Sequence, residues 1–179
     1  MSEDTLLYIE SGGDVTTLIS DWYDDDYDDE WNDEEYDKPV HRKLNTMVFI
    51  DAESVSASSC SRIIGQANSI GDIAEIRYYA RQKDNSTAAW KDLARRYGIK
   101  PILMYGDPAK DKIDNKIKKD IRSVLQTNKS IDIFCIASRD GGYTDLVNEL
   151  RNLRKRVVIL ATKDTSKRLK QSASEVRGI

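Results

Sequence analysis

The sequence is poor in the residues on which metal cages, disulfide frameworks and most histidine-dependent mechanisms rely. Among 179 residues there are two cysteines, Cys60 and Cys135, and one histidine, His41. Their number and spacing suit neither a zinc site nor a disulfide framework. No apolar run approaches the ~20 residues of a membrane span, and no basic start leads into an apolar stretch at the N-terminus. We therefore expect a cytoplasmic protein that does not bind membranes, whose chemistry rests mainly on carboxylates.

Several motifs of common enzyme classes are also missing. No GxxxxGK[ST] sequence is present, and no GxGxxG follows the first predicted strand, which argues against a P-loop protein and a dinucleotide-binding protein. Ser138 has no GxSxG setting and no histidine partner, so a serine hydrolase is disfavoured. Cys60 and Cys135 are more typical of core residues than of nucleophiles.

Charge divides the chain into two parts of opposite sign. Residues 1–40 carry 15 acidic residues and one lysine, a net charge of −14, whereas residues 41–179 carry a net charge of +11. Pro39 marks the boundary. The sequence thus predicts an acidic tail, residues 1–40, followed by one basic domain, residues 41–179.

The tail has an unusual mixture of acids and aromatics. Eleven of the seventeen residues from Asp21 to Asp37 are acidic. Charge repulsion at this density opposes compaction and predicts a disordered, solvated tail. Five aromatic residues interleaved with the acids favour a second interpretation, docking on a basic surface of this chain or of a partner protein; they are Trp22, Tyr23, Tyr27, Trp31 and Tyr36.

The basic domain alternates short apolar runs with amphipathic segments. This alternation predicts a three-layer α/β domain with a mostly parallel five-stranded sheet. The predicted strands are residues 47–50, 73–80, 101–105, 131–137 and 157–161. The predicted helices are residues 56–69, 86–97, 113–126, 143–153 and 166–171.

Acidic residues gather where these strands end. Asp51 and Glu53 follow the first strand, Asp107 follows the third, Asp140 follows the fourth, and Asp114 begins the long helix. In such folds the ligand site lies outside the carboxyl ends of the strands. Clustered carboxylates repel one another and call for a cation, and Mg²⁺ or Mn²⁺ prefers oxygen ligands. The alternative is that each aspartate is only a helix cap or turn residue.

Basic residues stand close to these acids in the sequence. Lys112, Lys116 and Lys119 flank the long helix, and Arg139 precedes Asp140. A divalent ion beside such cations would suit a phosphodiester substrate, because the ion activates water while the cations hold the polyanion. The alternative is a solvated helix face.

Three sequence blocks together resemble the NYN domain family of PIN-like nucleases, which includes the LabA-like proteins. The blocks are VFIDAES at residues 48–54, KID at residues 112–114 with Asp120 further along the helix, and ASRDGGYTDLV at residues 137–147. They occur in the family's order and spacing, and the resemblance extends over about residues 46–172.

The resemblance implies a PIN-like α/β sandwich and a metal-dependent nuclease that acts on RNA, more often single-stranded. By the same resemblance, Asp51, Asp114 and Asp140 would be the catalytic and metal-binding residues, with Asp120 and Glu53 as further candidate ligands. PIN-like proteins often form homodimers, so the resemblance allows a homodimer and leaves the oligomeric state open.

Two positions depart from the family pattern. Gly142 replaces the second acid of the family's Ser-x-Asp-x-Asp-aromatic block, and Ser54 replaces the usual asparagine of Asp-x-Glu-Asn. The loss of one carboxylate weakens a metal site. The second hypothesis is therefore a nuclease-like module that binds RNA or a protein without cutting.

Overall fold

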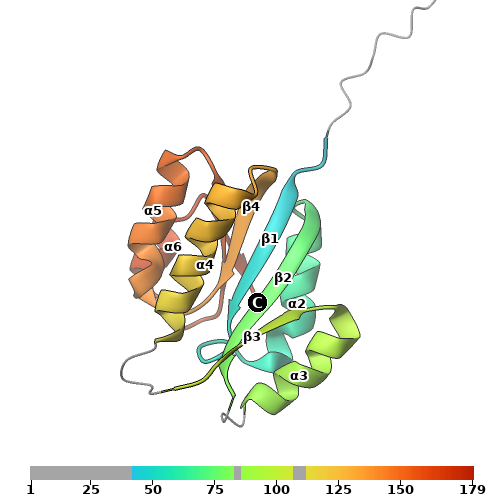
Figure 1. Cartoon of the computed structure of the whole chain (residues 1–179). Coiled ribbons are helices and arrows are strands. Elements are labelled where there is room, and N and C mark those ends of the chain that lie inside the picture. The colour runs from blue at the N-terminus through green and yellow to red at the C-terminus, as the bar shows by residue number, and fades with distance from the viewer. Residues whose placement is uncertain (1–41, 83–85, 107–111) are drawn as a thin grey trace, which may run out of the picture. The chain divides into compact units, whose positions relative to one another are not determined.

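A computed structural model describes residues 42–82, 86–106 and 112–179 of the chain (Figure 1). The predicted acidic tail and Asp107 lie outside these residues. In the described part, six parallel strands form one sheet in the order β3-β2-β1-β4-β5-β6. The strands are β1 Asn45–Asp51, β2 Asp72–Arg81, β3 Lys100–Met104, β4 Ile131–Ala137, β5 Arg156–Ala161 and β6 Glu175–Gly178.

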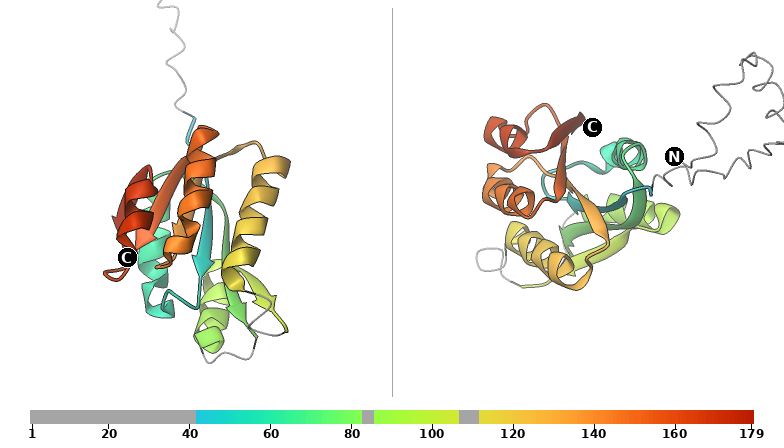
Figure 2. Two further views of the ribbon diagram at one scale, coloured as in Figure 1. Left: turned by 90° about the vertical axis from the view of Figure 1, so that its left-hand side faces the viewer. Right: turned by 90° about the horizontal axis from the view of Figure 1, so that it is seen from above.

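Helices cover both faces of the sheet and make the three layers that Figure 2 shows. On one face lie α2 and α3, and on the other lie α4, α5 and α6. Their bounds are α2 Cys60–Asn68, α3 Ser86–Tyr97, α4 Ile113–Thr127, α5 Thr144–Asn152 and α6 Lys167–Ser172, with short 3-10 helices η4 Ala57–Ser59 and η5 Gly141–Tyr143. Within the described residues, no helix combines the length and the apolar character needed to cross a membrane.

The predicted α/β class with a mostly parallel sheet is confirmed, but the prediction of five strands is wrong. The sixth strand, β6, pairs in parallel with β5 at the edge of the sheet. Its four residues, EVRG, include two charged side chains and no apolar run. By contrast, β1 and β4 are buried on both faces, which explains their nearly continuous apolar sequences.

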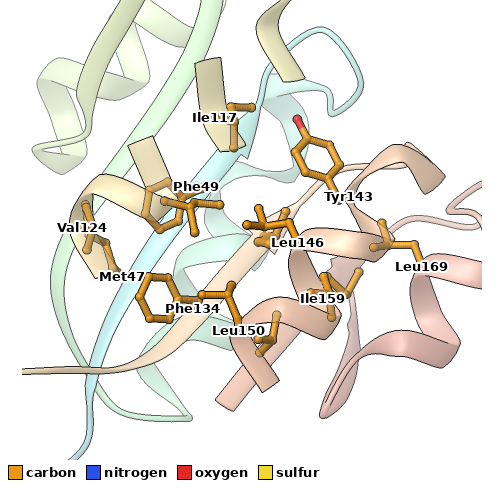
Figure 3. Packing of buried hydrophobic residues seen from close by; sticks show 14 of the residues in the cluster. Met47, Phe49, Ile117, Val124, Phe134, Tyr143, Leu146, Leu150, Ile159 and Leu169 are labelled. Carbon is orange, nitrogen blue, oxygen red and sulfur yellow. The ribbon is translucent and has the colours of Figure 1, made fainter. Parts of the chain in front are cut away.

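One hydrophobic cluster fills the space between the sheet and the helices α4, α5 and α6 (Figure 3). On the sheet, the Phe49 ring stacks between Tyr79 and Phe134, with ring centroids 6.5 and 6.2 Å apart. The helix α4 faces this cluster with a stripe at helical spacing, Ile113, Ile117, Ile121 and Val124. Each large apolar side chain buried in this way contributes roughly 1.5–3 kcal/mol to folding.

Two glycines fix the path of the chain on the other face. Gly98 ends α3 with a φ of 66°, a left-handed conformation that glycine adopts without strain. Gly71 lies so close to β1 that a Cβ atom there would be 2.2 Å from the carbonyl oxygen of Leu44. The next amide, of Asp72, donates a hydrogen bond to that same oxygen at 2.9 Å. Gly71 thereby allows β2 to begin against β1.

The strand order reverses direction between β1 and β4. On one side of β1 the sheet continues with β2 and β3, and on its other side with β4, β5 and β6. Because all pairs are parallel, the carboxyl ends of β1 and β4 lie at the same edge of the sheet. In open α/β sheets this switch point forms a crevice in which ligands bind.

Candidate active site

A pocket of about 470 Å³ opens at this switch point. It is called the acidic pocket here, and its lining comes from the ends of β1 and β2, the start of α4 and the loop after β4. The structure thus brings together Asp51, Glu53, Asp114, Asp140 and Lys112, all of which the sequence analysis selected. The complete lining is Asp51, Glu53, Ser54, Arg81, Lys112, Ile113, Asp114 and Asp140.

Asp51 is the last residue of β1 and is buried, with 7% of its surface exposed. Its Oδ1 accepts hydrogen bonds from the backbone amides of Glu53 and Ser54 at 3.2 and 3.3 Å, and its Oδ2 accepts one from the Ser138 hydroxyl at 3.0 Å. Burial raises the pKa of Asp51 above its ordinary value, against the opposing effect of these hydrogen bonds. The carboxyl is therefore fixed in orientation but costly to ionise.

Two serine hydroxyls join the loop after β1 to the loop after β4. The Oγ atoms of Ser54 and Ser138 are 3.1 Å apart. The amide of Arg139 donates to Ser54 Oγ at 3.3 Å, and the amide of Asp140 donates to Ser138 Oγ at 3.1 Å. Ser54, which replaces the family's asparagine, thus still connects the two halves of the site.

Tyr143 places a hydroxyl against the same carboxylates. The residue is fully buried, and its hydroxyl donates to Asp51 Oδ2 at 3.5 Å. Burial and then the negative charges of Asp51, Asp114 and Asp140 raise the pKa of Tyr143. The hydroxyl consequently stays protonated and is a donor toward these acids.

Asp114 lies in the first turn of α4, where the helix dipole favours a negative charge. Lys118, one turn further along, contacts its Oδ2 at 3.0 Å. The Lys118 ammonium group also lies 5.5 Å from the centre of the Tyr143 ring. Lys118 therefore offsets part of the negative charge next to the pocket.

Asp140 begins η5 as its N-cap. Its Oδ1 accepts a hydrogen bond from the backbone amide of Gly142 at 2.8 Å. This contact uses only the backbone of residue 142, so the capping role stays intact without the family's second acid. Asp140 itself is exposed and borders the pocket. Asp140 therefore caps η5 and also borders the pocket, so the two interpretations do not exclude each other.

Sequence reasoning missed Arg81, which borders the pocket from the end of β2. Its guanidinium Nε lies 3.0 Å from Glu53 Oε1, and 18% of its side chain is exposed. The same strand-end rule that selects Asp51 also applies to Arg81, which directly follows the predicted strand at residues 73–80, but only acids were considered at the strand ends. Glu53 is thus held by a cation of the chain itself.

The predicted phosphate-binding residues lie in different surroundings. Lys112 borders the acidic pocket. Arg139 lies in an adjoining hollow of about 450 Å³, which also contains Glu53 and Ser54. Lys119 borders a shallow groove on the outer surface of α4. The structure therefore brings only Lys112 of these three into the pocket.

Asp120 and Lys116 are not among the residues that line the acidic pocket. Asp120 accepts hydrogen bonds from the Tyr79 hydroxyl at 3.1 Å and from Lys116 at 2.6 Å. Burial raises the pKa of Tyr79, and the negative charge of Asp120 raises it further. Asp120 is thus bonded to Tyr79 and Lys116 and does not line the acidic pocket.

The donor set fits an open, hydrated metal site better than a closed one. Within residues 42–82, 86–106 and 112–179, no three acidic, histidine or cysteine side chains are close enough together to hold one ion. Mg²⁺ usually keeps several waters and binds through one or two carboxylates. Asp51, Asp114 and Asp140 offer such hard oxygen donors around one pocket. They fit Mg²⁺ or Mn²⁺ held through one or two carboxylates.

The cysteines are buried in the cluster beneath α2 and α3, as predicted. Burial raises the pKa of Cys60 and raises that of Cys135 to about 12. Neither thiol therefore ionises readily, and neither has the surroundings of a nucleophile.

A parallel α/β sheet with a carboxylate-lined pocket at its switch point places the protein among the open α/β domains, in which ligands bind in this crevice. The NYN domain family model matches residues 45–178. The chain belongs to the NYN domain family, whose members have a PIN-like nuclease fold and are generally nucleases. PIN-like nuclease domains typically use divalent metal ions.

Solved structures support the fold. A crystal structure of a protein of unknown function from Vibrio parahaemolyticus is similar, with a TM-score of 0.64 and 17% sequence identity. The match covers 78% of this chain and 94% of the other. At this identity the likeness concerns the fold alone. Among curated proteins, no sequence matches the chain.

Proposed function

We propose that this NYN-domain protein is a divalent-metal-dependent nuclease that cleaves single-stranded RNA. One observation carries the proposal: three aspartates border a single pocket at the switch point of a domain that is otherwise basic. A basic domain attracts a polyanion, whereas the acids suit an ion that works on phosphate. The choice of RNA follows from the family resemblance.

The position of each residue in the pocket suggests its role in the proposed reaction. Asp51, Asp114 and Asp140 would provide the one or two carboxylates that hold Mg²⁺ or Mn²⁺, and the bound ion would supply the charge that activates water and stabilises phosphate oxygens. Ser138 and Tyr143 donate to Asp51 and keep its carboxylate in one orientation. Asp120 has partners of its own, so we leave it out of the metal site.

The backbone of the substrate would be held by cations at the rim. Lys112 and Arg81 border the pocket, and Arg139 borders the adjoining hollow. Arg81 offers a rigid planar group, although part of its charge is engaged by Glu53. Lys116 and Lys119 would add contacts along α4 only for a longer strand.

The test is cleavage of labelled single-stranded RNA in Mg²⁺ or Mn²⁺. Asp51→Asn and Asp140→Asn should each lower the rate by at least about 100-fold while far-ultraviolet circular dichroism stays the same. Asp145→Asn is the matched control, because Asp145 is exposed and contacts only Arg168 among the described residues. Full activity in both pocket variants would refute the proposal, as would undiminished cleavage with the metal chelated.

A second candidate function has an observation of its own. Gly142 replaces the family's second acid, and the described residues contain no group of three ligands for one ion. These facts favour a module that binds RNA without cutting it. Specific RNA binding by the purified protein, with no cleavage by any form in either metal, would decide for this function.

A further inference from the structure

A second pocket lies between the end of α3 and the start of β3, and none of its lining residues borders the acidic pocket. We call it the α3–β3 pocket; its volume is about 270 Å³. Its walls are apolar, formed by Ala94, Ile99, Pro101 and Leu103. Binding sites for small molecules are mostly apolar hollows in which a few polar groups fix the orientation of the ligand.

Tyr78 lies in the wall of this pocket, with its hydroxyl oxygen closed off from solvent. Its side chain is fully buried and stacks on Trp90, with the ring centroids 5.7 Å apart and 16° between the ring planes. Its hydroxyl has no hydrogen-bond partner in the described part of the chain. A buried donor without a partner is costly and uncommon in folded proteins, and an unfilled ligand site is one explanation for it.

Two cations stand beside the pocket. Lys91 and Arg95 are exposed, lie one turn apart on α3 and both line the pocket. Neither forms an ion pair with another described residue. Like charges at this spacing destabilise a helix slightly, whereas an anion between them would relieve the repulsion.

We propose that the α3–β3 pocket binds one nucleotide of an RNA strand. The base lies against the apolar walls, Tyr78 moves so that its buried hydroxyl donates a hydrogen bond to a base carbonyl, and the phosphate lies beside Lys91 and Arg95. A nucleotide carries ring, acceptor and anion in one compact unit, which suits a pocket of this size better than an acidic peptide does. The choice of RNA as the ligand rests on the proposed function, but binding here does not require cleavage.

The first test is RNA affinity in the full-length chain carrying Asp51→Asn, which keeps the RNA intact. Fluorescence anisotropy with labelled single-stranded RNA should show about 3- to 10-fold weaker binding for Tyr78→Phe, the loss of one hydrogen bond. Lys91→Ala should reduce the slope of log affinity against log salt by about 0.7, the value for one phosphate contact. Matched controls are Tyr97→Phe and Arg62→Ala, an exposed phenol and an exposed cation outside the pocket.

A second measurement does not depend on RNA binding elsewhere on the domain. Uridine 5′-monophosphate should shift the indole N–H signal of Trp90 in a ¹⁵N-labelled sample, and Tyr78→Phe should weaken that response. The proposal is overturned if Tyr78→Phe only raises the unfolding temperature and leaves RNA affinity unchanged. It is also overturned if a peptide of residues 21–37 shifts the Trp90 signal and the nucleotide does not. Nucleotide binding without any RNA cleavage by the wild type would refute the proposed nuclease function but not the nucleotide site in the α3–β3 pocket.

Discussion

At the scale of single residues, Asp51 shows a conflict between stability and chemistry. Its carboxyl is buried, so its pKa lies above the ordinary value. The folded protein therefore holds this proton more tightly than the unfolded chain does. The stabilising contribution is complete below the unfolded pKa and is lost as the pH rises through the folded pKa. At neutral pH the charged group opposes folding unless a cation compensates it.

Asp51→Asn should accordingly raise the stability of the protein at pH 7 in the absence of divalent ions. A gain on the order of 1 kcal/mol would raise the unfolding temperature by about 2–4 °C, and the gain should shrink at pH 4. Thermal unfolding in a chelator, followed by circular dichroism, measures it. Asp145→Asn, with a side chain 88% exposed, should change nothing. A lower unfolding temperature for Asp51→Asn at pH 7 would contradict the account.

Gly142→Asp should strengthen metal binding. A Cβ atom at this position would lie 3.3 Å from both carboxylate oxygens of Asp140, so that side chain must move by a few tenths of an ångström. The added carboxylate increases repulsion, which a divalent ion relieves, and we expect roughly tenfold tighter metal binding with faster cleavage. Gly142→Ala supplies the same crowding without the charge. Equal metal titration curves for the two variants would show that the missing acid is not what limits the site.

Geometry explains which of the predicted site residues line the acidic pocket and which do not. Asp51 and Asp140 were placed by one rule, that parallel strands end at one edge of the sheet. Asp114 reaches the same pocket from the start of α4. Asp120 follows Asp114 by six residues, which turns it about 240° around the helix at 100° per residue. Helical phase therefore explains why Asp120 contacts Tyr79 instead.

At the scale of elements, strands buried on both faces were predictable, whereas β6 at one edge of the sheet was not. β4 reads as an apolar run in the sequence, because helices cover both faces of it. β6 has only Val176 as an apolar residue, and Glu175 makes ion pairs with Arg156 and Arg177. The pair with Arg156 depends on the register between β5 and β6, which the sequence does not display.

Substitutions of two glycines test how closely the start of β2 must approach β1. Gly71→Ala should destabilise the protein by on the order of 2–3 kcal/mol, because the new methyl group would overlap the Leu44 carbonyl and displace the start of β2. Gly65→Ala, in an exposed position of α2 with no atom within 4 Å of the added Cβ, should instead stabilise it by roughly 0.5–1 kcal/mol. Denaturant titration of both variants gives the comparison. Similar stabilities would mean that β1 and β2 shift without cost.

At the scale of the whole molecule, the dominant feature is the opposition of charge between residues 1–40 and residues 41–179. The tail lies outside the described residues, and its docking on a basic surface stays a prediction. If the tail competes with RNA, deletion of residues 1–40 should raise RNA affinity, most strongly at low salt, because salt screens charge contacts. Anisotropy titrations of both forms at two salt concentrations measure this. Equal affinities at low salt would leave partner binding or solvation as the role of the tail.

The three aspartates of the acidic pocket lie outside the two hydrophobic clusters, and this has an evolutionary consequence. Asp51, Asp114 and Asp140 belong to neither cluster, and the cap at Asp140 needs only the backbone of residue 142. A lineage can therefore lose or regain an acid at that position by substitution of one residue, while the sheet and its helices persist. Enzymes and non-cutting binding proteins are then neighbours in sequence space on this scaffold, and the step between them costs the fold little.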